Sequence, residues 1–423
     1  MFTFELVLQI KQSMAFAIFF TVLILTLNSY VVFATWSHFG DGQWGLIWRL
    51  FLCFMIIWEI STLFIMSYQF RPEYGKASVA SNLFMGVTMS FLIAKLVIIV
   101  FLFMNDAYRL IRWPIESVIS DGSVSFEGRR KFMTNIGLIT AAIPFTGLLY
   151  GTLKGKYNYK VWKQQLAFND LPESFNGLRI AQLSDIHSGS LDNPDAVRHG
   201  LRELMSHKPD MILLTGDLVN NFASEMDDYV DIFREELSAP LGMYAVMGNH
   251  DYGEYVQWDS DADRENNILA VQDRYKQIGF DLLNNESRQL EVNGETINLV
   301  GVENWGGGGF PKYGDFDKAI ENVSDDSFKI LMSHDPDHWD LKVLDHDVHV
   351  NLTLAGHTHG SQMGIEIPGW VKWSPVKYRY KRWAGLYQEK DQYLYVNRGF
   401  GFLGYPGRIG IWPEITIFNL KKA

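Results

Sequence analysis

Five short apolar runs in the second half of the 423-residue chain each end in side chains that can bind a metal ion. Ligands in open α/β sheets sit beyond the carboxyl ends of the strands. One such ending carries little information, but five in one domain are poorly explained by chance. We therefore predict that these endings meet at one metal centre. The candidate ligands are Asp185, His187, Asp217, Asn249, His334, His357 and His359.

The predicted ligand set is too large for a single tetrahedral zinc ion, which needs four ligands. It suits two ions that share one carboxylate. Two ions about 3.5–4 Å apart can clamp both the attacking and the leaving oxygen of a phosphoryl group. The mixture of imidazole, carboxylate and amide oxygen favours Mn, Fe or Zn over Mg or Ca. The cofactor prediction is therefore two divalent metal ions.

His250 directly follows the predicted ligand Asn249 and is not needed as a ligand itself. An imidazole beside a metal pair is well suited to act as the general acid that protonates a leaving alkoxide. Asp251 is predicted as its catalytic partner, orienting the ring; alternatively, Asp251 caps the next segment.

The elements around these residues are short strands and amphipathic helices. Strands that alternate with helices predict βαβ units, and the denser later strands predict a second sheet. The predicted helices cover 195–206 and 266–277. The predicted strands cover 178–183, 211–215, 243–247, 297–302, 329–332, 349–354, 393–396 and 415–418.

Together these motifs resemble the full motif set of the calcineurin-like metallophosphoesterases, over roughly residues 175–423. The motifs are Asp185-Ile186-His187, Gly216-Asp217, Gly248-Asn249-His250-Asp251, His334 and Gly356-His357-Thr358-His359. The resemblance implies a four-layer α/β/β/α sandwich. It implies one metal on Asp185, His187, Asp217 and His359, and a second on Asp217, Asn249, His334 and His357. His250 would be the catalytic histidine.

Two details narrow the subfamily. Phosphoprotein phosphatases of this superfamily carry acidic residues where this chain has Asn220, and Glu where it has Asp251, so a protein phosphatase is disfavoured. The tail motifs resemble the membrane-associated YkuE/YaeI-like group, although Gly360-Ser361-Gln362 departs from the usual Gly-Gly-Gln. These tail motifs are Asn397-Arg398-Gly399-Phe400-Gly401, Pro406-Gly407-Arg408 and Pro413-Glu414-Ile415. Arg398 and Arg408 are candidate phosphate-binding residues or, equally, structural cations.

The first part of the chain is a predicted multi-span α-helical membrane region. Residues 12–40 contain no charged side chain. This uncharged segment is longer than the roughly 20 apolar residues that are needed to cross a bilayer. The predicted spans are 14–34, 50–68, 79–103 and 132–150. We accordingly predict a membrane domain at 1–153, a polar connector at 154–177 and the metallophosphoesterase domain at 178–423.

Glu59 and Lys95 lie inside predicted spans, where charges are costly and usually have a partner. They either pair between neighbouring helices or lie nearer the membrane surface than these boundaries suggest. Cys53 is the single cysteine, which excludes an intramolecular disulfide framework and a multi-cysteine zinc cluster.

The net charge of 37 minus 48, or −11, argues against binding to duplex nucleic acid. It divides unevenly, with 10 minus 8, or +2, in residues 1–150 and 27 minus 40, or −13, in the remainder. Basic residues before the fourth span favour a cytoplasmic loop there, which places the catalytic domain outside. Lysines after that span oppose this. Residues 129–133 resemble an internal twin-arginine signal or are an ordinary basic flank, and the interpretation leans extracytoplasmic.

Two further segments are unusual. Trp305-Gly306-Gly307-Gly308-Gly309-Phe310 forms a glycine loop that either borders the active site or is a plain surface loop. Residues 370–387 interleave aromatic and basic side chains, a mixture that suits a membrane interface or ordinary packing beneath a solvated basic face.

The sequence therefore predicts an integral, multi-pass membrane enzyme that hydrolyses phosphodiesters or phosphomonoesters with metal-activated water. Its expected partners are the bilayer and a phosphate-ester substrate, either soluble or lipid-linked, without an obligate protein partner. One alternative is a lipid-linked pyrophosphatase of the UDP-diacylglucosamine hydrolase type, whose cytoplasmic substrate an extracytoplasmic domain could not reach. Another is a non-catalytic membrane sensor or scaffold, against which the complete ligand set argues.

Overall fold

A computed structural model describes residues 22–423 apart from 37, 41, 70–75, 120–126 and 368. The chain divides into two compact units. The first comprises Met1–Tyr68 with Leu83–Tyr150, and the second comprises Gln69–Asn82 with Gly151–Ala423. Each unit has its own buried core.

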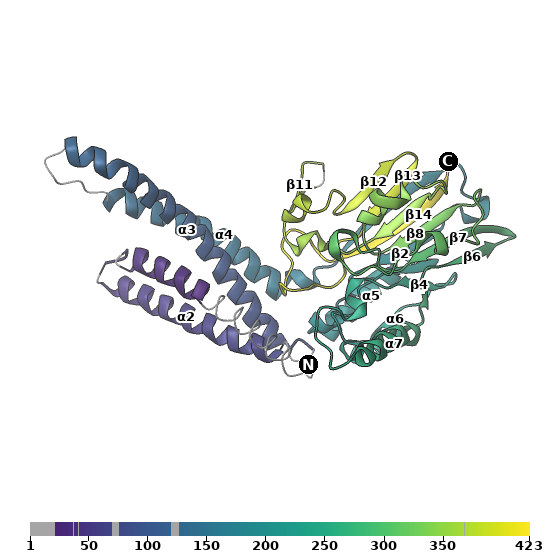
Figure 1. The fold of residues 1–423 in the computed structure, drawn as a ribbon, viewed down its shortest axis with the longest axis horizontal. Coiled ribbons are helices and arrows are strands. Elements are labelled where there is room, and N and C mark those ends of the chain that lie inside the picture. Colours follow the sequence, from purple (N-terminus) through teal and green to yellow (C-terminus); the bar gives the residue numbers. More distant parts are fainter. Residues whose placement is uncertain (1–21, 37, 41, 70–75, 120–126, 368) are drawn as a thin grey trace. The chain divides into compact units, whose positions relative to one another are not determined.

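The first unit is helical in its described parts (Figure 1). Its helices are α2 (Gln43–Gln69), α3 (Val79–Ile119) and α4 (Glu127–Leu153), preceded by a shorter apolar helix at Val22–Thr35. Three segments, Gln43–Ser61, Val79–Ile115 and Gly128–Leu153, are long and apolar enough to cross a membrane. They overlap the predicted spans 50–68, 79–103 and 132–150. The fourth prediction, 14–34, lies partly outside the described residues, and the helix at Val22–Thr35 covers the rest of it.

Many large apolar side chains of these helices point outward, including Phe33, Ile57, Val100 and Ile143. An outward apolar surface on a helix bundle suits hydrocarbon, where every backbone polar group is already bonded within its own helix. The helices therefore have the composition and the exposure pattern of a membrane bundle.

Three polar side chains are buried inside this bundle and bond to one another. Lys95 Nζ donates to Glu59 Oε1 and, at 2.8 Å, to Asn28 Oδ1. Asn28 Nδ2 donates to Glu59 Oε2 at 2.8 Å. Each of the three side chains is about 1% exposed. The predicted pairing of Glu59 with Lys95 is therefore confirmed, and Asn28 completes a triangle that joins three helices.

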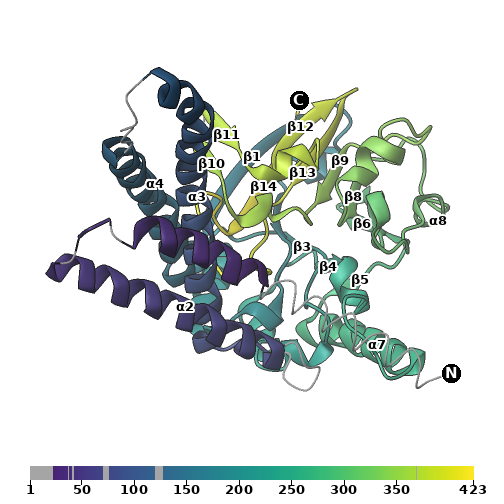
Figure 2. The same cartoon turned by 60° about the vertical axis from the view of Figure 1, so that its left-hand side comes forward.

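The second unit contains two six-stranded mixed sheets (Figures 1 and 2). Sheet one is ordered β1 (Lys160–Phe168), β14 (Glu414–Lys422), β2 (Arg179–Leu183), β3 (Met211–Thr215), β4 (Met243–Val246) and β5 (Asp281–Leu282). Sheet two is ordered β12 (Gly385–Glu389), β13 (Gln392–Val396), β9 (Leu352–Ala355), β8 (Lys329–Ser333), β7 (Glu295–Val302) and β6 (Glu286–Val292). Strands β2 to β5 run parallel, as do β13, β9, β8 and β7.

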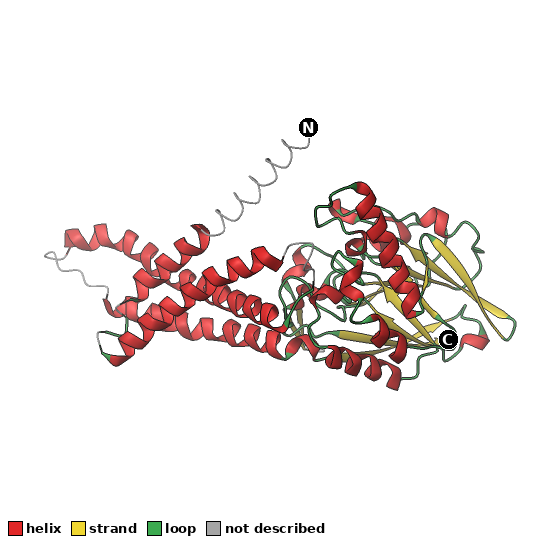
Figure 3. Cartoon of the chain, turned by 90° about the horizontal axis from the view of Figure 1, so that it is seen from below, coloured by secondary structure: helices red, strands yellow, loops and turns green. Residues whose placement is uncertain are grey.

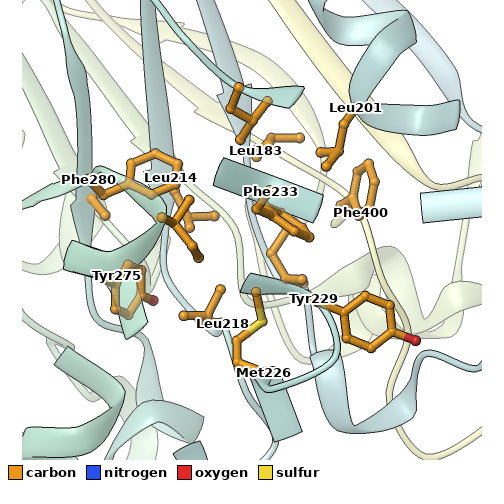
Figure 4. Close-up of a cluster of buried hydrophobic side chains, with 14 of the residues drawn as sticks. Leu183, Leu201, Leu214, Leu218, Met226, Tyr229, Phe233, Tyr275, Phe280 and Phe400 are labelled. Carbon is orange, nitrogen blue, oxygen red and sulfur yellow. The ribbon is translucent and has the colours of Figure 1, made fainter. Parts of the chain in front are cut away.

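Alternating side chains of the central strands pack to opposite faces of their sheets. Ile180 and Leu213 of sheet one meet Leu299 and Met332 of sheet two in one buried cluster. The other face of sheet one packs on α5 (Pro194–Ser206), α6 (Val230–Glu236) and α7 (Asp261–Ile278), as Figure 4 shows for Leu183, Leu214, Phe233 and Tyr275. The other face of sheet two packs on α8 (Phe316–Ala319) and the helical turn Trp339–Val343.

This unit is a four-layer α/β/β/α sandwich, as expected, with its strands lying between helices (Figure 3). A small separate ribbon, β10 (Ile365–Ile367) with β11 (Val371–Trp373), completes the list of strands.

The expectation of a connector at 154–177 is wrong for part of that segment. Residues 160–168 form β1, which pairs in parallel with β14 in the register Lys160↔Glu414. Only Leu166 and Phe168 of this strand are buried, because β1 lies at the edge of its sheet. The lysines and glutamines on its exposed side gave the segment its connector-like composition.

The buried triangle yields a stability prediction. Lys95→Met leaves the Glu59 carboxylate buried without its cation, which costs on the order of 3 kcal/mol in buried pairs. We expect this variant to unfold at a lower temperature in detergent micelles, as measured by tryptophan fluorescence. The control Lys154→Met removes an exposed lysine and should unfold like the wild type.

The double variant Glu59→Leu/Lys95→Met removes both charges and should recover part of the loss, because no unpaired charge stays buried. Equal unfolding temperatures for Lys95→Met and Lys154→Met would show that the triangle does not stabilise the bundle.

Candidate metal centre

Every predicted metal ligand lies just beyond the carboxyl end of a parallel strand. Asp185 and His187 follow β2, Asp217 follows β3 and Asn249 follows β4, all in sheet one. His334 follows β8, and His357 and His359 follow β9, both in sheet two. The two sheets pack face to face, so these endings meet at one edge of the sandwich.

The first ligand cluster contains Asp185, His187 and His359, all buried. His359 Nε2 lies 3.2 Å from Asp185 Oδ1, and 3.0 Å from His187 Nε2. Two imidazole nitrogens and one carboxylate oxygen therefore point at the same small volume, which is the donor set and spacing of a metal site.

The second cluster contains Asp217, His334 and His357. His334 Nε2 lies 3.1 Å from Asp217 Oδ2 and 3.3 Å from His357 Nδ1. Asn249 Oδ1 lies 2.8 Å from that same His357 Nδ1. The structure thus brings all seven predicted ligands together.

Asp217, a member of the second cluster, also lies close to the first. Its Oδ2 atom, 3.1 Å from His334 of the second cluster, is also 3.5 Å from His187 Nε2 of the first. The Asp217 carboxylate thus faces donors of both clusters.

The ring nitrogens that point away from the clusters are also held. His187 Nδ1 lies 3.1 Å from Asn220 Oδ1, and His334 Nδ1 lies 2.7 Å from the Thr215 carbonyl oxygen. His357 Nε2 lies 2.8 Å from the Tyr380 hydroxyl oxygen. Such outer partners fix the orientation of a metal-binding imidazole and decide which nitrogen carries its proton.

The backbone at the ligands is strained. Among the described residues, twelve that are not glycine have positive φ, and five of these are ligands. L-residues adopt this left-handed conformation rarely, and it persists only where the surrounding structure enforces it. The five ligands are Asp185 (φ 52°), His187 (φ 48°), Asp217 (φ 57°), His357 (φ 73°) and His359 (φ 50°).

Two motif glycines are required by close packing. A Cβ atom on Gly248 would lie 2.2 Å from Asp217 Oδ1, and one on Gly356 would lie 2.4 Å from Asp185 Oδ2. The same carboxylates accept hydrogen bonds from backbone amides: His250 N donates to Asp217 Oδ1 at 2.9 Å, and His357 N donates to Asp185 Oδ1 at 3.0 Å. Each ligand carboxylate is thus fixed by the amide of another motif residue.

The electrostatics of the site call for positive charge. Burial would raise the pKa values of Asp185 and Asp217, but His359 beside the first and His334 beside the second lower both below the usual carboxyl range. Burial opposes protonation of His334, yet the charge of Asp217 raises the pKa of His334 to about 10. Burial lowers the pKa of His187 and, together with His334, lowers the pKa of His357 to about 4. The ionised carboxylates of Asp185 and Asp217 and the neutral rings of His187 and His357 are in the protonation states that metal ions bind, whereas His334 must lose its proton to bind one.

His250 borders the clusters without belonging to either. Its Nδ1 atom lies 2.8 Å from the Asn220 carbonyl oxygen, and its ring contacts the His187 ring edge-on at a centroid distance of 4.9 Å. Tyr255 packs on the His250 ring at 4.4 Å. The side chain is partly exposed, so it can reach a bound substrate.

The expectation that Asp251 orients His250 is wrong, because the Asn220 carbonyl holds the His250 ring. The buried Asp251 carboxylate instead accepts backbone N–H groups of Asp217, Leu218, Val219 and Gly248 at 2.9–3.3 Å, and the Tyr275 hydroxyl at 2.8 Å. Burial and the nearby Asp217 raise the pKa of Asp251 to about 7. Its role is to hold the strained turn that carries Asp217.

The phosphate-binding alternative for Arg398 and Arg408 is also contradicted, because both side chains are buried and engaged within the protein. Arg398 forms ion pairs with Glu366 and Glu414 at 2.6 and 2.5 Å. Arg408 donates to the carbonyl oxygens of Gly401 and Arg398 and lies 3.1 Å from His359 Nδ1. Both arginines therefore fit the alternative prediction, that they are structural cations.

Aromatic residues lie beside the site. Their spacing in the sequence did not predict that they would gather there. Phe310 packs edge-on against the His357 ring at 4.7 Å. A cavity of about 290 Å³ is lined by Glu254, Tyr255, Gly308, Gly309, Phe310 and Pro311. Since its lining residues Tyr255 and Phe310 contact site histidines, the glycine loop borders the site, one of the two readings of the sequence.

Comparison with known proteins agrees with both units. Residues 13–156 match the family model described as "Probable Calcineurin-like phosphoesterase, transmembrane domain", and residues 178–361 match the model "Calcineurin-like phosphoesterase". The uncharacterized metallophosphoesterase YkuE of Bacillus subtilis is 30% identical over 304 residues, covering 70% of this chain and 98% of YkuE.

Two other relatives are similar over shorter shares. A transmembrane protein with metallophosphoesterase domain from Danio rerio is 28% identical over 68% of this chain and 62% of its own length. The UDP-2,3-diacylglucosamine pyrophosphatase LpxG of Chlamydia trachomatis is 29% identical over 55% of this chain and 81% of its own length.

The two clusters yield a metal-content prediction, measured by inductively coupled plasma mass spectrometry on the purified full-length chain. We expect about two divalent ions per wild-type chain and about one per chain in His187→Ala or His334→Ala, since each removes a ligand of one cluster. His346→Ala changes a histidine that pairs with Asp317 outside the site and should keep both ions. A wild-type chain with no bound metal would contradict the site, as would equal metal content in all three variants.

Proposed function

The chain belongs to the calcineurin-like metallophosphoesterases and carries a transmembrane phosphoesterase domain before the catalytic one. We propose that it is a membrane-anchored, binuclear-metal phosphohydrolase that cleaves phosphodiesters or phosphomonoesters. The observation that carries the proposal is the position of Asp217 within reach of both ligand clusters. A hydrolase of this family with one shared carboxylate has what a two-ion phosphoryl-transfer site requires.

In this proposal Asp185, His187, Asp217 and His359 hold one ion, and Asp217, Asn249, His334 and His357 hold the other. Bound divalent ions supply the Lewis acidity that lowers the pKa of a water molecule and neutralises charge on the phosphoryl group. The protein's part is to keep seven donors in fixed positions, through the outer partners Asn220, Thr215 and Tyr380 and through the left-handed backbone.

His250 is the proposed general acid. Its Nδ1–H donates to the Asn220 carbonyl, which leaves Nε2 to carry the proton that is transferred. Packing against Tyr255 and His187 restricts rotation of the ring. A proton held at Nε2 can pass to the leaving alkoxide and spare the reaction a costly anionic leaving group.

A second candidate is a lipid-linked pyrophosphate substrate. LpxG, a relative by sequence, is named as a UDP-2,3-diacylglucosamine pyrophosphatase. The cavity beside the site is lined in part by Tyr255 and Phe310, which suits a substrate with an apolar portion. This candidate requires the catalytic domain to face the cytoplasm, where that kind of precursor is found.

The side of the membrane distinguishes the candidates. We propose an extracytoplasmic catalytic domain, on the basic residues that precede the fourth predicted span, 132–150. A topology reporter fused after Ala423 tests it: activity of an extracytoplasmic reporter supports this side, and activity of a cytoplasmic reporter favours the pyrophosphatase. The sensor or scaffold alternative is disfavoured, because a non-catalytic site has no need to keep the full ligand set and its strained backbone.

The hydrolase proposal is tested with bis(p-nitrophenyl) phosphate and added Mn²⁺ on the purified full-length chain. Asp217→Ala removes the shared ligand, and we expect the rate to fall by at least about three orders of magnitude because both ions lose a ligand. The control Asp231→Ala removes an exposed aspartate on α6 and should retain the wild-type rate. Similar rates for wild type and Asp217→Ala would refute the proposal.

The role of His250 predicts a dependence on the leaving group. We expect His250→Gln to slow hydrolysis of an alkyl phosphate ester by about 10²–10⁴-fold, the usual contribution of a general acid. A p-nitrophenyl ester needs little protonation of its leaving group, so the same variant should slow it far less. An equal loss with both esters would mean that His250 does not protonate the leaving group.

A further inference from the structure

The β10–β11 ribbon, introduced above as a separate two-stranded element, has one polar and one apolar face. In its antiparallel register Ile365 pairs with Trp373, Ile367 with Val371, and Glu366 with Lys372. Successive side chains of a strand point to opposite faces. The four apolar side chains therefore share one face of the ribbon, and the charged pair lies on the other. Figure 2 labels the two strands.

On the polar face of the ribbon Glu366 is turned toward the protein, whereas the Lys372 side chain contacts the protein but remains exposed. Glu366 accepts hydrogen bonds from Arg398 Nε at 2.9 Å and from Arg398 Nη2 at 2.6 Å, and that arginine is buried. Lys372 Nζ donates to the Ala384 carbonyl oxygen and lies 5.0 Å from the centre of the Trp383 ring. These contacts fix which face of the ribbon looks outward.

The outward face is apolar, which is the reverse of what water favours. Ile365 is 52% exposed, and Trp370, at the turn between the strands, is 79% exposed. Tyr378, in the helical turn that follows the ribbon, is also 79% exposed. Large apolar side chains exposed together on one short segment of chain mark an interaction site.

We propose that this ribbon, with Trp370 and Tyr378, inserts into the surface of a phospholipid bilayer. Tryptophan and tyrosine concentrate at the membrane–water boundary, where the ring is apolar and its N–H or O–H group stays hydrated. Two three-residue strands offer far less area than the roughly 800 Å² per partner of a stable protein interface. The bilayer is also the one partner that the chain's own membrane helices keep nearby.

The local charge agrees with this partner. Residues 363–383 hold five basic side chains and one acidic one, 5 minus 1, or +4, in a chain of net charge −11. Asp337 lies 3.7 Å from Arg379, and Asp340 pairs with Lys381 and Arg382. The positive charge at the ribbon therefore comes mainly from the exposed Lys372, in β11, and the exposed Lys377, in the turn that follows it. Basic side chains beside interfacial aromatics are attracted to anionic lipid headgroups.

The ribbon is fastened to the loop that carries two metal ligands. Ser374 Oγ, directly after β11, donates to the Gly360 carbonyl oxygen at 2.7 Å, and Thr358 Oγ1 donates to the Trp383 carbonyl oxygen at 2.6 Å. Tyr380, two residues after Tyr378, contacts His357. If the proposed hydrolase activity holds, insertion of the ribbon brings a phosphate ester embedded in the same bilayer close to the metal centre.

The insertion is tested by spin labelling, for which the single cysteine is an advantage. In a Cys53→Ser background, Trp370→Cys is labelled with a nitroxide, and the full-length chain is placed in nanodiscs of phosphatidylcholine and phosphatidylglycerol. We expect relaxation of the label by oxygen and protection from a water-soluble nickel complex. The control Leu269→Cys, at an exposed leucine of α7, should be fully accessible to nickel.

Equal nickel accessibility at positions 370 and 269 would overturn the proposal. So would dipolar coupling between labels at 370 of two chains, since that would identify a second copy as the partner. Neither result depends on enzymatic activity.

A second measurement tests the consequence for the substrate. Trp370→Ser/Tyr378→Ser should hydrolyse hexadecyl p-nitrophenyl phosphate in nanodiscs on the order of tenfold more slowly than wild type, because residence at the surface raises the local substrate concentration. The same variant should hydrolyse soluble bis(p-nitrophenyl) phosphate at the wild-type rate, and Leu269→Ser should change neither rate. Equal losses on both substrates would contradict a role in presenting lipid. No hydrolysis of either substrate by wild type would refute the proposed function and leave the labelling result to judge the ribbon.

Discussion

The second unit is organised around the crowding of ligand side chains at Asp217. Two carboxylates and several imidazoles converge within about 3.0–3.5 Å of one another in a buried volume. Such a set is tolerable only with positive charge among the donors, supplied without metal by the proton that Asp217 favours on His334. The backbone bears part of the cost, since five ligands adopt the left-handed conformation. Asp251 holds the turn after β3 through four backbone amides, and Gly248 leaves room for the Asp217 carboxylate.

That the predicted ligands lie together in the structure follows from a general property of parallel strands. Their carboxyl ends meet at one edge, so polar residues that end separate apolar runs must converge there. The sequence is less informative wherever a residue's role depends on the direction of its side chain. Asp251 adjoins His250 in the chain but bonds to the turn of Asp217, and Arg398 and Arg408 carry charges that suit phosphate but are buried against acidic groups and carbonyls. Strand β1 was likewise not predicted, because it lies at the edge of its sheet and its exposed lysines and glutamines have the composition of a polar connector. The aromatic shell of Tyr255, Phe310 and Tyr380 is assembled from distant segments.

In the helical unit, too, each buried charged side chain that the structure describes has a partner of opposite charge or a hydrogen-bonding group. In hydrocarbon an unpaired charge is more costly than in a hydrated protein, and the single buried cation, among the described residues of the bundle, sits between an acid and an amide. The ribbon presents the complementary case, in which apolar side chains face outward while Glu366 on the opposite face pairs with the buried Arg398. Both features link this hydrolase to a bilayer, one through spanning helices and the other through a surface element attached to the loop of His357 and His359.

The proposed hydrolysis requires two ions acting together at Asp217. The most direct test is a titration of the metal-depleted full-length chain with Mn²⁺, in which the rate of phosphodiester hydrolysis is followed against bound metal per chain. If both ions are required, we expect little activity at one equivalent of Mn²⁺ and full activity only as the second equivalent binds. Full activity at one bound ion per chain, or hydrolysis that persists without bound metal, would contradict it.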